Sequence, residues 1–484
     1  MNIVTNAAVN NSDQTERLPC EKGSIKHRAS KMIGIAVTML GIAHQAQAVT
    51  ASQVANIYSG ISFFGDYYTE QDLGPLDSNP EGFTRFRNEL VFSAEDFSTG
   101  KELWVYDGRQ VRQIADINPQ FSIDDFPPAS SSSPADFVVF GDKLLFSADN
   151  GSSGRELWSY DGKGVRQVAD INFGSAGSFP KSFTVFGDEL VFIANDGVHG
   201  QELWSYDGTQ VRLLADVNTL GAASPSGLTV FGDELVFRAN GGNANGGTEP
   251  WAYDGSQVRR IADIRPGPLS SSPSGFTVFN DELVFYASDG VSGFEPWAYD
   301  GGQVRQLADI RAGSPGSGPI AVIMRVIGNE LVFSANDGTT GIEPWSYDGK
   351  QVRQLADINP LGDSNPGGLV RLGTELVFSA SSNPSERTLW SYDGKQVHQV
   401  ADAPLVPFNI TAVANNLVAF SAIGESGREL WAYNGRQVYQ LADINHAGSS
   451  EPANLTVFGN ELVFSANDGA TGNEMWRIVQ PGVQ

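Results

Sequence analysis

Four loops of this chain carry an aspartate followed six residues later by a glutamate, a pattern that could supply oxygen ligands to Ca²⁺. The aspartates are Asp196, Asp289, Asp337 and Asp468, each in an Asn-Asp-Gly or Ser-Asp-Gly sequence. Calcium takes about six to eight oxygens, so one aspartate and one glutamate are too few unless carbonyl groups and water complete the shell. Because Asn-Asp-Gly is also ordinary turn chemistry, we expect structural turns and no cofactor, with Ca²⁺ binding as the alternative.

The tryptophans form a second set of candidates, since an exposed indole can stack on a sugar ring. All nine recur at the same point of a repeated sequence, 41 to 54 residues apart, and the candidates for ligand contact are Trp204, Trp251, Trp297 and Trp345. One large aromatic side chain buries about 150 to 250 Å², and an environment repeated in every copy needs only one packing solution. Packing between neighbouring copies is therefore the favoured interpretation, and a multivalent lectin is the alternative.

Three more sets of charged residues recur in step with the tryptophans. Glutamates stand two residues before the Trp at Glu102, Glu156, Glu202, Glu249, Glu295, Glu343, Glu429 and Glu474. Arginines follow at Arg112, Arg166, Arg212, Arg259, Arg305 and Arg353, and aspartates at Asp116, Asp170, Asp216, Asp263, Asp309, Asp357, Asp402 and Asp443. We expect the glutamates and arginines to form cross-strand ion pairs, and the aspartates to accept backbone hydrogen bonds in the turns between units.

Support for enzymatic chemistry is slight, so an enzyme is the less favoured class. The histidines beyond residue 48, His199, His398 and His446, stand at unrelated points of the repeat and predict neither a catalytic triad nor a zinc set. The repeat is interrupted at 120–136, 241–247 and 320–326, where solvated surface loops are the favoured interpretation. A paired-carboxylate hydrolase using Asp124 or Asp125 is the remaining alternative.

Short strands are the elements that must position these residues. In the copy at 183–218 we expect strands at 183–186, 189–194, 202–206 and 210–216, the last two joined by an Asp-Gly turn with positive φ at both positions. No segment of comparable length has helical periodicity, so the chain is predicted to be all-β. A period of about 47 residues marks a repeated supersecondary unit, and the units start near 82, 137, 183, 228, 275, 321, 369, 410 and 454.

Sheets stacked around an axis would cover both faces of every unit, which predicts a closed β-propeller of four-stranded blades. About nine blades are expected; eight is the alternative, because the seventh copy lacks the Gly-rich loop and its glutamate. The ninth copy ends after three strands, and residues 53–60 resemble the fourth-strand sequence at 354–360. The N-terminal segment 49–81 is therefore expected to supply the missing strand from within 51–60, ahead of the repeats at 82–484, which closes the ring and removes edge strands.

The repeated Glu-Leu-Trp-x-x-Asp-Gly sequence, as at 202–208, resembles the ELWxxDGT repeat of exported bacterial proteins. The preceding Asn-Asp-Gly-x-x-Gly and the following Ala-Asp-Ile-x-x-Gly are similar to that family too, over residues 82 to 480. Two departures are Glu-Pro-Trp at three tryptophans, Trp251, Trp297 and Trp345, and the family's threonine, present only as Thr209. The resemblance implies an exported repeat protein, often linked to the cell surface, without a settled activity.

The composition of the chain limits the cellular environment in which it works and the partners that it can bind. Basic residues, an apolar run at 32–43 and Ala46-Gln47-Ala48 give residues 1–48 the layout of a secretory signal peptide. Its removal would take away Cys20, the single cysteine, and two net positive charges, which changes the net charge from −25 to −27. Such a surface repels nucleic acids, and no later stretch is apolar enough to span a membrane. We expect a secreted or cell-surface protein.

Repetition favours a binding or scaffolding module, because many copies of a weak site give avidity. The expected partner is a protein or a polysaccharide at the cell surface. A carbohydrate-active enzyme with a single site at the axis, or a multivalent lectin, is the alternative function.

Overall fold

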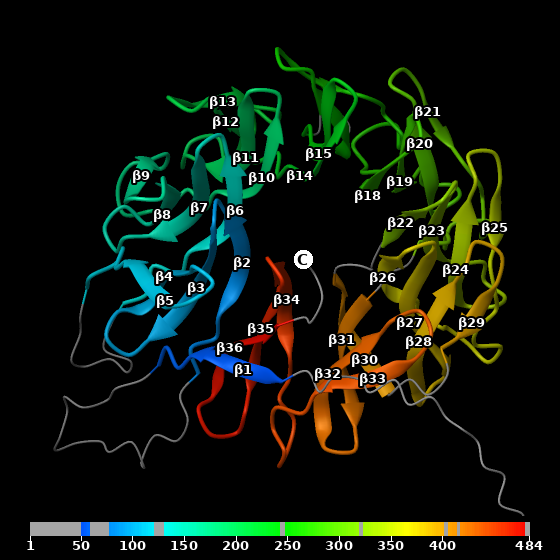
Figure 1. Ribbon diagram of the computed structural model, residues 1–484. Helices are drawn as coiled ribbons and strands as arrows, with labels where there is room; N and C mark the ends of the chain where they lie inside the picture. Colours follow the sequence, from blue (N-terminus) through cyan, green and yellow to red (C-terminus); the bar gives the residue numbers. More distant parts are fainter. Residues whose placement is uncertain are drawn as a thin grey trace, which may run out of the picture. The chain divides into compact units, whose positions relative to one another are not determined.

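The computed structural model describes residues 50–58, 77–120, 130–242, 247–318, 323–400, 405–413 and 417–479. In these residues the chain forms 36 strands and no helix. The strands make nine four-stranded sheets arranged as blades in a ring (Figure 1). The prediction of an all-β propeller with nine blades is thus confirmed, and the eight-bladed alternative is wrong. The predicted signal peptide at 1–48 lies outside the described residues.

The first four blades follow one another along the chain. Blade 1 contains β2 (Glu81–Phe86), β3 (Glu89–Asp96), β4 (Gly100–Tyr106) and β5 (Val111–Ala115). Blade 2 contains β6 (Ala135–Phe140), β7 (Lys143–Asp149), β8 (Arg155–Tyr160) and β9 (Val165–Ala169). Blade 3 contains β10 (Lys181–Phe186), β11 (Glu189–Asn195), β12 (Gln201–Tyr206) and β13 (Val211–Ala215). Blade 4 contains β14 (Ser226–Phe231), β15 (Glu234–Asn240), β16 (Thr248–Tyr253) and β17 (Val258–Arg260).

The next four blades repeat this order. Blade 5 contains β18 (Ser274–Phe279), β19 (Glu282–Ser288), β20 (Phe294–Tyr299) and β21 (Val304–Gln306). Blade 6 contains β22 (Met324–Ile327), β23 (Glu330–Asn336), β24 (Ile342–Tyr347) and β25 (Val352–Gln354). Blade 7 contains β26 (Gly367–Leu372), β27 (Glu375–Asn383), β28 (Glu386–Tyr392) and β29 (Val397–Gln399). Blade 8 contains β30 (Leu405–Val413), β31 (Leu417–Gly424), β32 (Gly427–Tyr433) and β33 (Val438–Ala442).

Blade 9 is assembled from both ends of the described chain. It contains β34 (Ala453–Phe458), β35 (Glu461–Asn467), β36 (Asn473–Val479) and, as its fourth strand, β1 (Ala51–Ala55). Gln53 pairs with Trp476, as Gln354 pairs with Trp345 in blade 6. The N-terminal strand therefore occupies the place that the sequence match predicted for it; residues 59 and 60 of the expected segment lie outside the described residues.

The first strand of each blade lies at the axis. Consecutive first strands contact one another from β2 through β6, β10, β14, β18, β22, β26 and β30 to β34, and β34 contacts β2. The ninth blade thus lies directly against the first, as Figure 1 shows for β34 and β2. The nine inner strands surround the axial channel.

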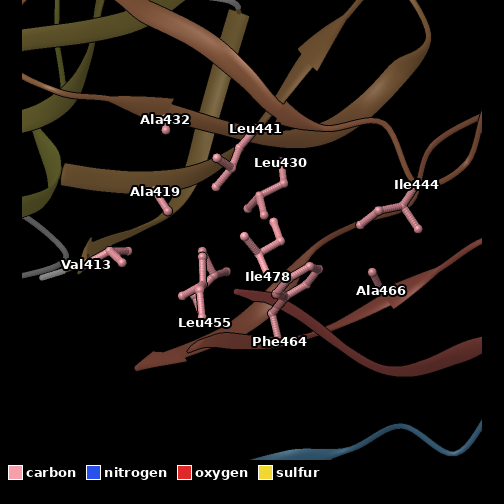
Figure 2. Close-up of a cluster of buried hydrophobic side chains, with 11 residues drawn as sticks. Val413, Ala419, Leu430, Ala432, Leu441, Ile444, Leu455, Phe464, Ala466 and Ile478 are labelled. Carbon is pink, nitrogen blue, oxygen red and sulfur yellow. The ribbon is translucent and has the colours of Figure 1, made fainter. Parts of the chain in front are cut away.

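The core consists of nine clusters, one at each junction between blades. Figure 2 shows the junction of blades 8 and 9, where Leu430 and Ala419 of blade 8 face Phe464, Leu455 and Ile478 of blade 9. All are at most 9% exposed. Burial of apolar area contributes about 25 cal/mol per Å², so each blade is stabilised by both neighbours.

Of the three hairpin connections in a blade, the first and the last differ in geometry. Gly187 has a φ of 59° and leads the two-residue turn between β10 and β11, as expected for a turn with glycine first. The Asp-Gly connection is longer: Asp207 receives hydrogen bonds on Oδ1 from the N–H groups of Thr209 and Gln210. Only Gly208 has a positive φ there. The expected two-residue Asp-Gly turn is thus wrong, because the Asp207 side chain organises a four-residue loop.

Candidate binding site in the axial channel

A bulge in the inner strands shapes the wall of the channel. In eight blades one residue of the bulge has a positive φ, and these residues are Gly82, Asp136, Ser182, Gly227, Gly275, Gly368, Asn409 and Asn454. In six blades a threonine two residues later donates its hydroxyl proton to the carbonyl oxygen of the bulge residue; Thr84 does so at 2.9 Å and Thr456 at 3.2 Å. The threonine satisfies a carbonyl group at the exposed edge of the sheet.

Blades 8, 9, 1 and 2 border a polar cavity of about 670 Å³ in this wall. It is lined by residues of β30, β34, β2 and β6, including Glu81, Asp136, Asn409, Thr411 and Asn454. Burial raises the pKa of Asp136 above its ordinary value. Glu81 and Asp136 have no carboxylate counterpart at the same positions of the other blades, so the cavity is asymmetric although the ring is repetitive.

A smaller cavity of about 360 Å³ lies on the wall formed by β18, β22, β26 and β30. Its lining includes the apolar side chains of Phe276, Ile323, Leu369 and Val370 together with the charged residue Arg325 and with Thr277. The two cavities give the channel a polar wall and an apolar wall.

The recurring glutamates are structural residues, and the partners predicted for them from the sequence are wrong. All eight are fully buried. Glu102 accepts hydrogen bonds from the N–H of Ile117 at 2.9 Å and from the N–H and hydroxyl of Ser132 at 2.8 and 2.6 Å. Each glutamate thus holds in place, by hydrogen bonds, the segment that leads to the next blade. Burial raises their pKa values, to about 7 for Glu102, Glu202, Glu343 and Glu474.

The expected ion pairs between these glutamates and the arginines are therefore wrong. Five of the six arginines bind another glutamate, at the start of the second strand, as Arg212 donates to Glu189 at 2.5 Å. Arg166 forms no ion pair with a described carboxylate, and blade 2 has Lys143 at the place of that glutamate. The hydroxyl of Tyr253 in the next blade donates to Glu189 at 3.1 Å and accepts from Arg212 at 3.4 Å. We call this trio the Glu-Arg-Tyr clasp. It is present at six junctions, with glutamates Glu89, Glu189, Glu234, Glu282, Glu330 and Glu461.

The recurring aspartates at the strand ends have no turn-fixing role among the described residues. None of the seven described members accepts a hydrogen bond from a backbone N–H, and Asp216 Oδ1 is buried without a partner. Asp402 lies outside the described residues. The expectation is wrong because the buried glutamate already accepts the N–H groups of this connection, as Glu202 does from Val217 at 3.1 Å.

The candidate tryptophans lie at the junctions between blades. Trp251 is part of the core between blades 3 and 4, and Trp204, Trp297 and Trp345 pack against the clusters of their own junctions. Trp251 and Trp297 also donate their indole N–H to carbonyl oxygens at 3.0 Å. Packing between neighbouring blades is therefore the role that the structure shows for these tryptophans.

The candidate calcium ligands are occupied by turn hydrogen bonds. Asp337 Oδ1 accepts from the N–H groups of Thr339 and Thr340, each at 2.7 Å, and Asp196, Asp289 and Asp468 accept in the same pattern. Burial acts to raise the pKa of Asp337, but these bonds outweigh it and lower the pKa. In the described part of the chain no group of three or more Asp, Glu, His or Cys is arranged to hold a metal ion.

The remaining candidates lie apart from one another. His199 Nδ1 is 2.6 Å from Asp196 Oδ2, His398 contacts the Ser391 hydroxyl at 2.8 Å, and His446 is near Asp443. Asp124 and Asp125 lie outside the described residues. None of the described histidines borders the two channel cavities, whose polar residues are not singled out by motif because they occupy positions that vary between repeats.

Comparison with known proteins found distant structural similarities. No family model matches the chain, and no curated protein matches it. A computationally designed protein, Ika8, has 18% identity and a TM-score of 0.40 over 83% of this chain and 97% of its own. The β-propeller domain of the Trilobed protease from Pyrococcus furiosus has 13% identity and a TM-score of 0.34 over 64% and 97%. Porphyromonas gingivalis dipeptidyl peptidase 4 has 9% identity and a TM-score of 0.47 over 81% and 65%.

No helix long and apolar enough to cross a membrane is present in the described residues.

Proposed function

We propose that this protein is an exported, ELWxxDGT-type propeller that serves as a binding module outside the cell, with its ligand in the axial channel. The observation that carries the proposal is the contrast between repeated and variable positions. The buried glutamates, the clasps and the tryptophans recur and are used for packing. The threonines around the cavity of about 670 Å³ recur too, whereas its two charged residues, Glu81 and Asp136, do not. Concave sites with a few convergent polar groups are the usual places for ligands.

A single site in the channel suits the binding of one protein or polysaccharide chain per propeller better than it suits a lectin with a site in every blade. A lectin with one site per blade would need the same exposed groups in each blade. The tryptophans that could have supplied them pack between blades, and the loop aspartates accept backbone hydrogen bonds. The ligand is therefore expected to bind once per propeller.

Calorimetric titration of the protein starting at Val49 with a pool of polysaccharides and with extracellular protein extracts tests the proposal. One site per chain is expected, and Thr456→Trp, which fills the polar cavity, should abolish binding. Thr209→Trp on an outer turn is the matched control and should bind normally. Several sites per chain would refute a channel site, and equal binding by both variants would refute a site at the polar cavity.

A further inference from the structure

Two arginines meet at one blade junction beside the channel. Arg325 lies on β22 and Arg371 on β26, and these inner strands contact each other. Both side chains are exposed. The chain as a whole carries a net charge of −25. The equivalent positions in blade 3 are Thr184 and Val185, and blade 1 has an arginine, Arg85, at the place of Arg371.

The strand register directs both side chains toward this junction. Arg325 pairs with Val332, and Arg371 pairs with Leu376. Directly paired residues of an antiparallel sheet share a face. Val332 and Leu376 belong to one core cluster, the one between blades 6 and 7. The two arginines therefore extend from facing surfaces at the axial end of the same junction.

No described carboxylate forms an ion pair with either arginine. Arg325 Nη1 donates to the carbonyl oxygen of Met324 at 3.1 Å, and Arg371 Nε donates to that of Gly373 at 2.8 Å. The arginines of the clasps, by contrast, each bind a glutamate, as Arg353 binds Glu330. A bound anion would give both guanidinium groups the charged partner that they lack.

The wall beside the arginines is apolar and has an uncapped strand edge. The cavity of about 360 Å³ is lined by Arg325 together with Phe276, Ile323 and Val370. Val370 stands where six other blades have the threonine that binds the bulge carbonyl, so the edge of β26 lacks this protection at Gly368. Exposed strand edges pair readily with an extended peptide, whose alternate side chains then enter pockets.

We propose that the junction of β22 and β26 binds an extended acidic peptide segment, with carboxylates at Arg325 and Arg371 and an apolar side chain in the adjoining cavity. The inference rests on the proposed function only for binding in the axial channel; it names a ligand class and places it on the wall away from the polar cavity. A peptide fits better than an acidic polysaccharide, because the wall presents the apolar side chains of Ile323, Leu369 and Val370 beside a strand edge.

Fluorescence anisotropy with a labelled octapeptide of alternating aspartate and leucine tests the inference. Binding is expected to weaken about tenfold for Arg325→Gln and for Arg371→Gln, since charge-assisted hydrogen bonds are the strong ones, and to weaken with rising salt. Arg109→Gln, on an exposed turn of blade 1, is the matched control. Neither channel variant should lower the melting temperature, because each arginine donates only to carbonyl groups near it in sequence.

Three results would overturn the inference. The first is equal affinity for the same peptide with lysine or serine in place of aspartate. The second is binding that Thr456→Trp abolishes but Arg325→Gln and Arg371→Gln leave unchanged, which places the peptide on the other wall. The third is binding of polygalacturonate without binding of the peptide. The second and third results leave a channel binding module intact, whereas binding outside the channel refutes both proposals.

Discussion

Arg477 donates from Nη1 to the Tyr106 hydroxyl at 2.6 Å and to Glu461 Oε1 at 2.8 Å, which joins the last blade to the first. In the other five clasps the arginine lies on the fourth strand, as Arg212 does on β13. Here it lies on the third strand, β36, and faces Ser52 of β1. The clasp is retained although blade 9 takes its fourth strand from the other end of the chain. The arginine of this clasp lies on the third strand of the blade instead.

Replacing Tyr106 by phenylalanine tests the strength of this junction. The Tyr106 hydroxyl also donates to Glu461 Oε2 at 2.9 Å, and its removal leaves two charged groups with one partner fewer. We expect a loss of about 1 to 3 kcal/mol in the free energy of unfolding, measured by denaturant titration. Tyr439→Phe is the control, because the Tyr439 hydroxyl has no hydrogen-bond partner in the described part of the chain. Equal stability of the two variants would contradict a role for the clasp.

Removing β1 should have a larger effect than losing one clasp. The strand pairs along β36, and the Ile57 N–H donates to buried Glu474 at 3.0 Å. A chain starting at Gly60 would expose the edge of β36 and leave that carboxylate short of a donor, so we expect a markedly lower melting temperature and concentration-dependent aggregation. Scanning calorimetry and size-exclusion chromatography would compare it with a chain starting at Val49. A monomer with an unchanged melting temperature would show that the ring does not need its fourth strand.

Most of the fold follows from the repeat in the sequence. Tryptophan spacing, Asp-Gly turns and the match between 53–60 and 354–360 predicted the strands, the nine units and the strand from the N-terminus. These features are local or repeated, and a repeated unit has one packing solution. They sufficed even for blade 7, where Thr388 replaces the buried glutamate and pairs with Ala380 in the same ladder.

The partners of charged residues were harder to predict, because they depend on contacts between blades. Sequence proximity favoured Glu202 as the partner of Arg212, yet Arg212 binds Glu189, and Glu202 accepts from the N–H of Ala223. The strand register distinguishes the two glutamates. Arg212 pairs with Ser205, which pairs with Val191, so Arg212 shares a face with Glu189, whereas Glu202 lies on the opposite face. Channel residues such as Arg325 were missed for another reason: they depart from the repeat, and the repeat was the source of the prediction.

The buried glutamates should make stability depend on pH. Burial raises the pKa of Glu202 to about 7, from an ordinary value near 4.5. Folding therefore favours the protonated form of Glu202. The contribution of this group to the free energy of unfolding is complete below about pH 4.5 and is lost as the pH rises through about 7. The loss amounts to about 3 kcal/mol. We expect the free energy of unfolding to fall between pH 5 and pH 8.

Glu202→Gln supplies the test of that slope. Glutamine does not titrate, so the variant should lose less stability between about pH 5 and pH 8 than the parent protein. It should also be less stable at low pH, since its amide places a donor against the N–H of Val217 or Ala223. Denaturant unfolding at several pH values gives both slopes, and parallel curves would show that Glu202 keeps an ordinary pKa.

The loop aspartates provide a test of turn formation with an internal control. Asp337 Oδ1 accepts two N–H groups, and blade 2 uses Asn150 at the equivalent place, where Oδ1 accepts from Ser152 and Ser153 at 2.9 and 2.8 Å. Because an amide oxygen serves as well as a carboxylate, Asp337→Asn should change the free energy of unfolding by less than about 0.5 kcal/mol, whereas Asp337→Ala should lower it by about 1 kcal/mol. If Ca²⁺ is a ligand here, asparagine would instead be as harmful as alanine in calcium, and the parent protein alone would gain stability when calcium is added.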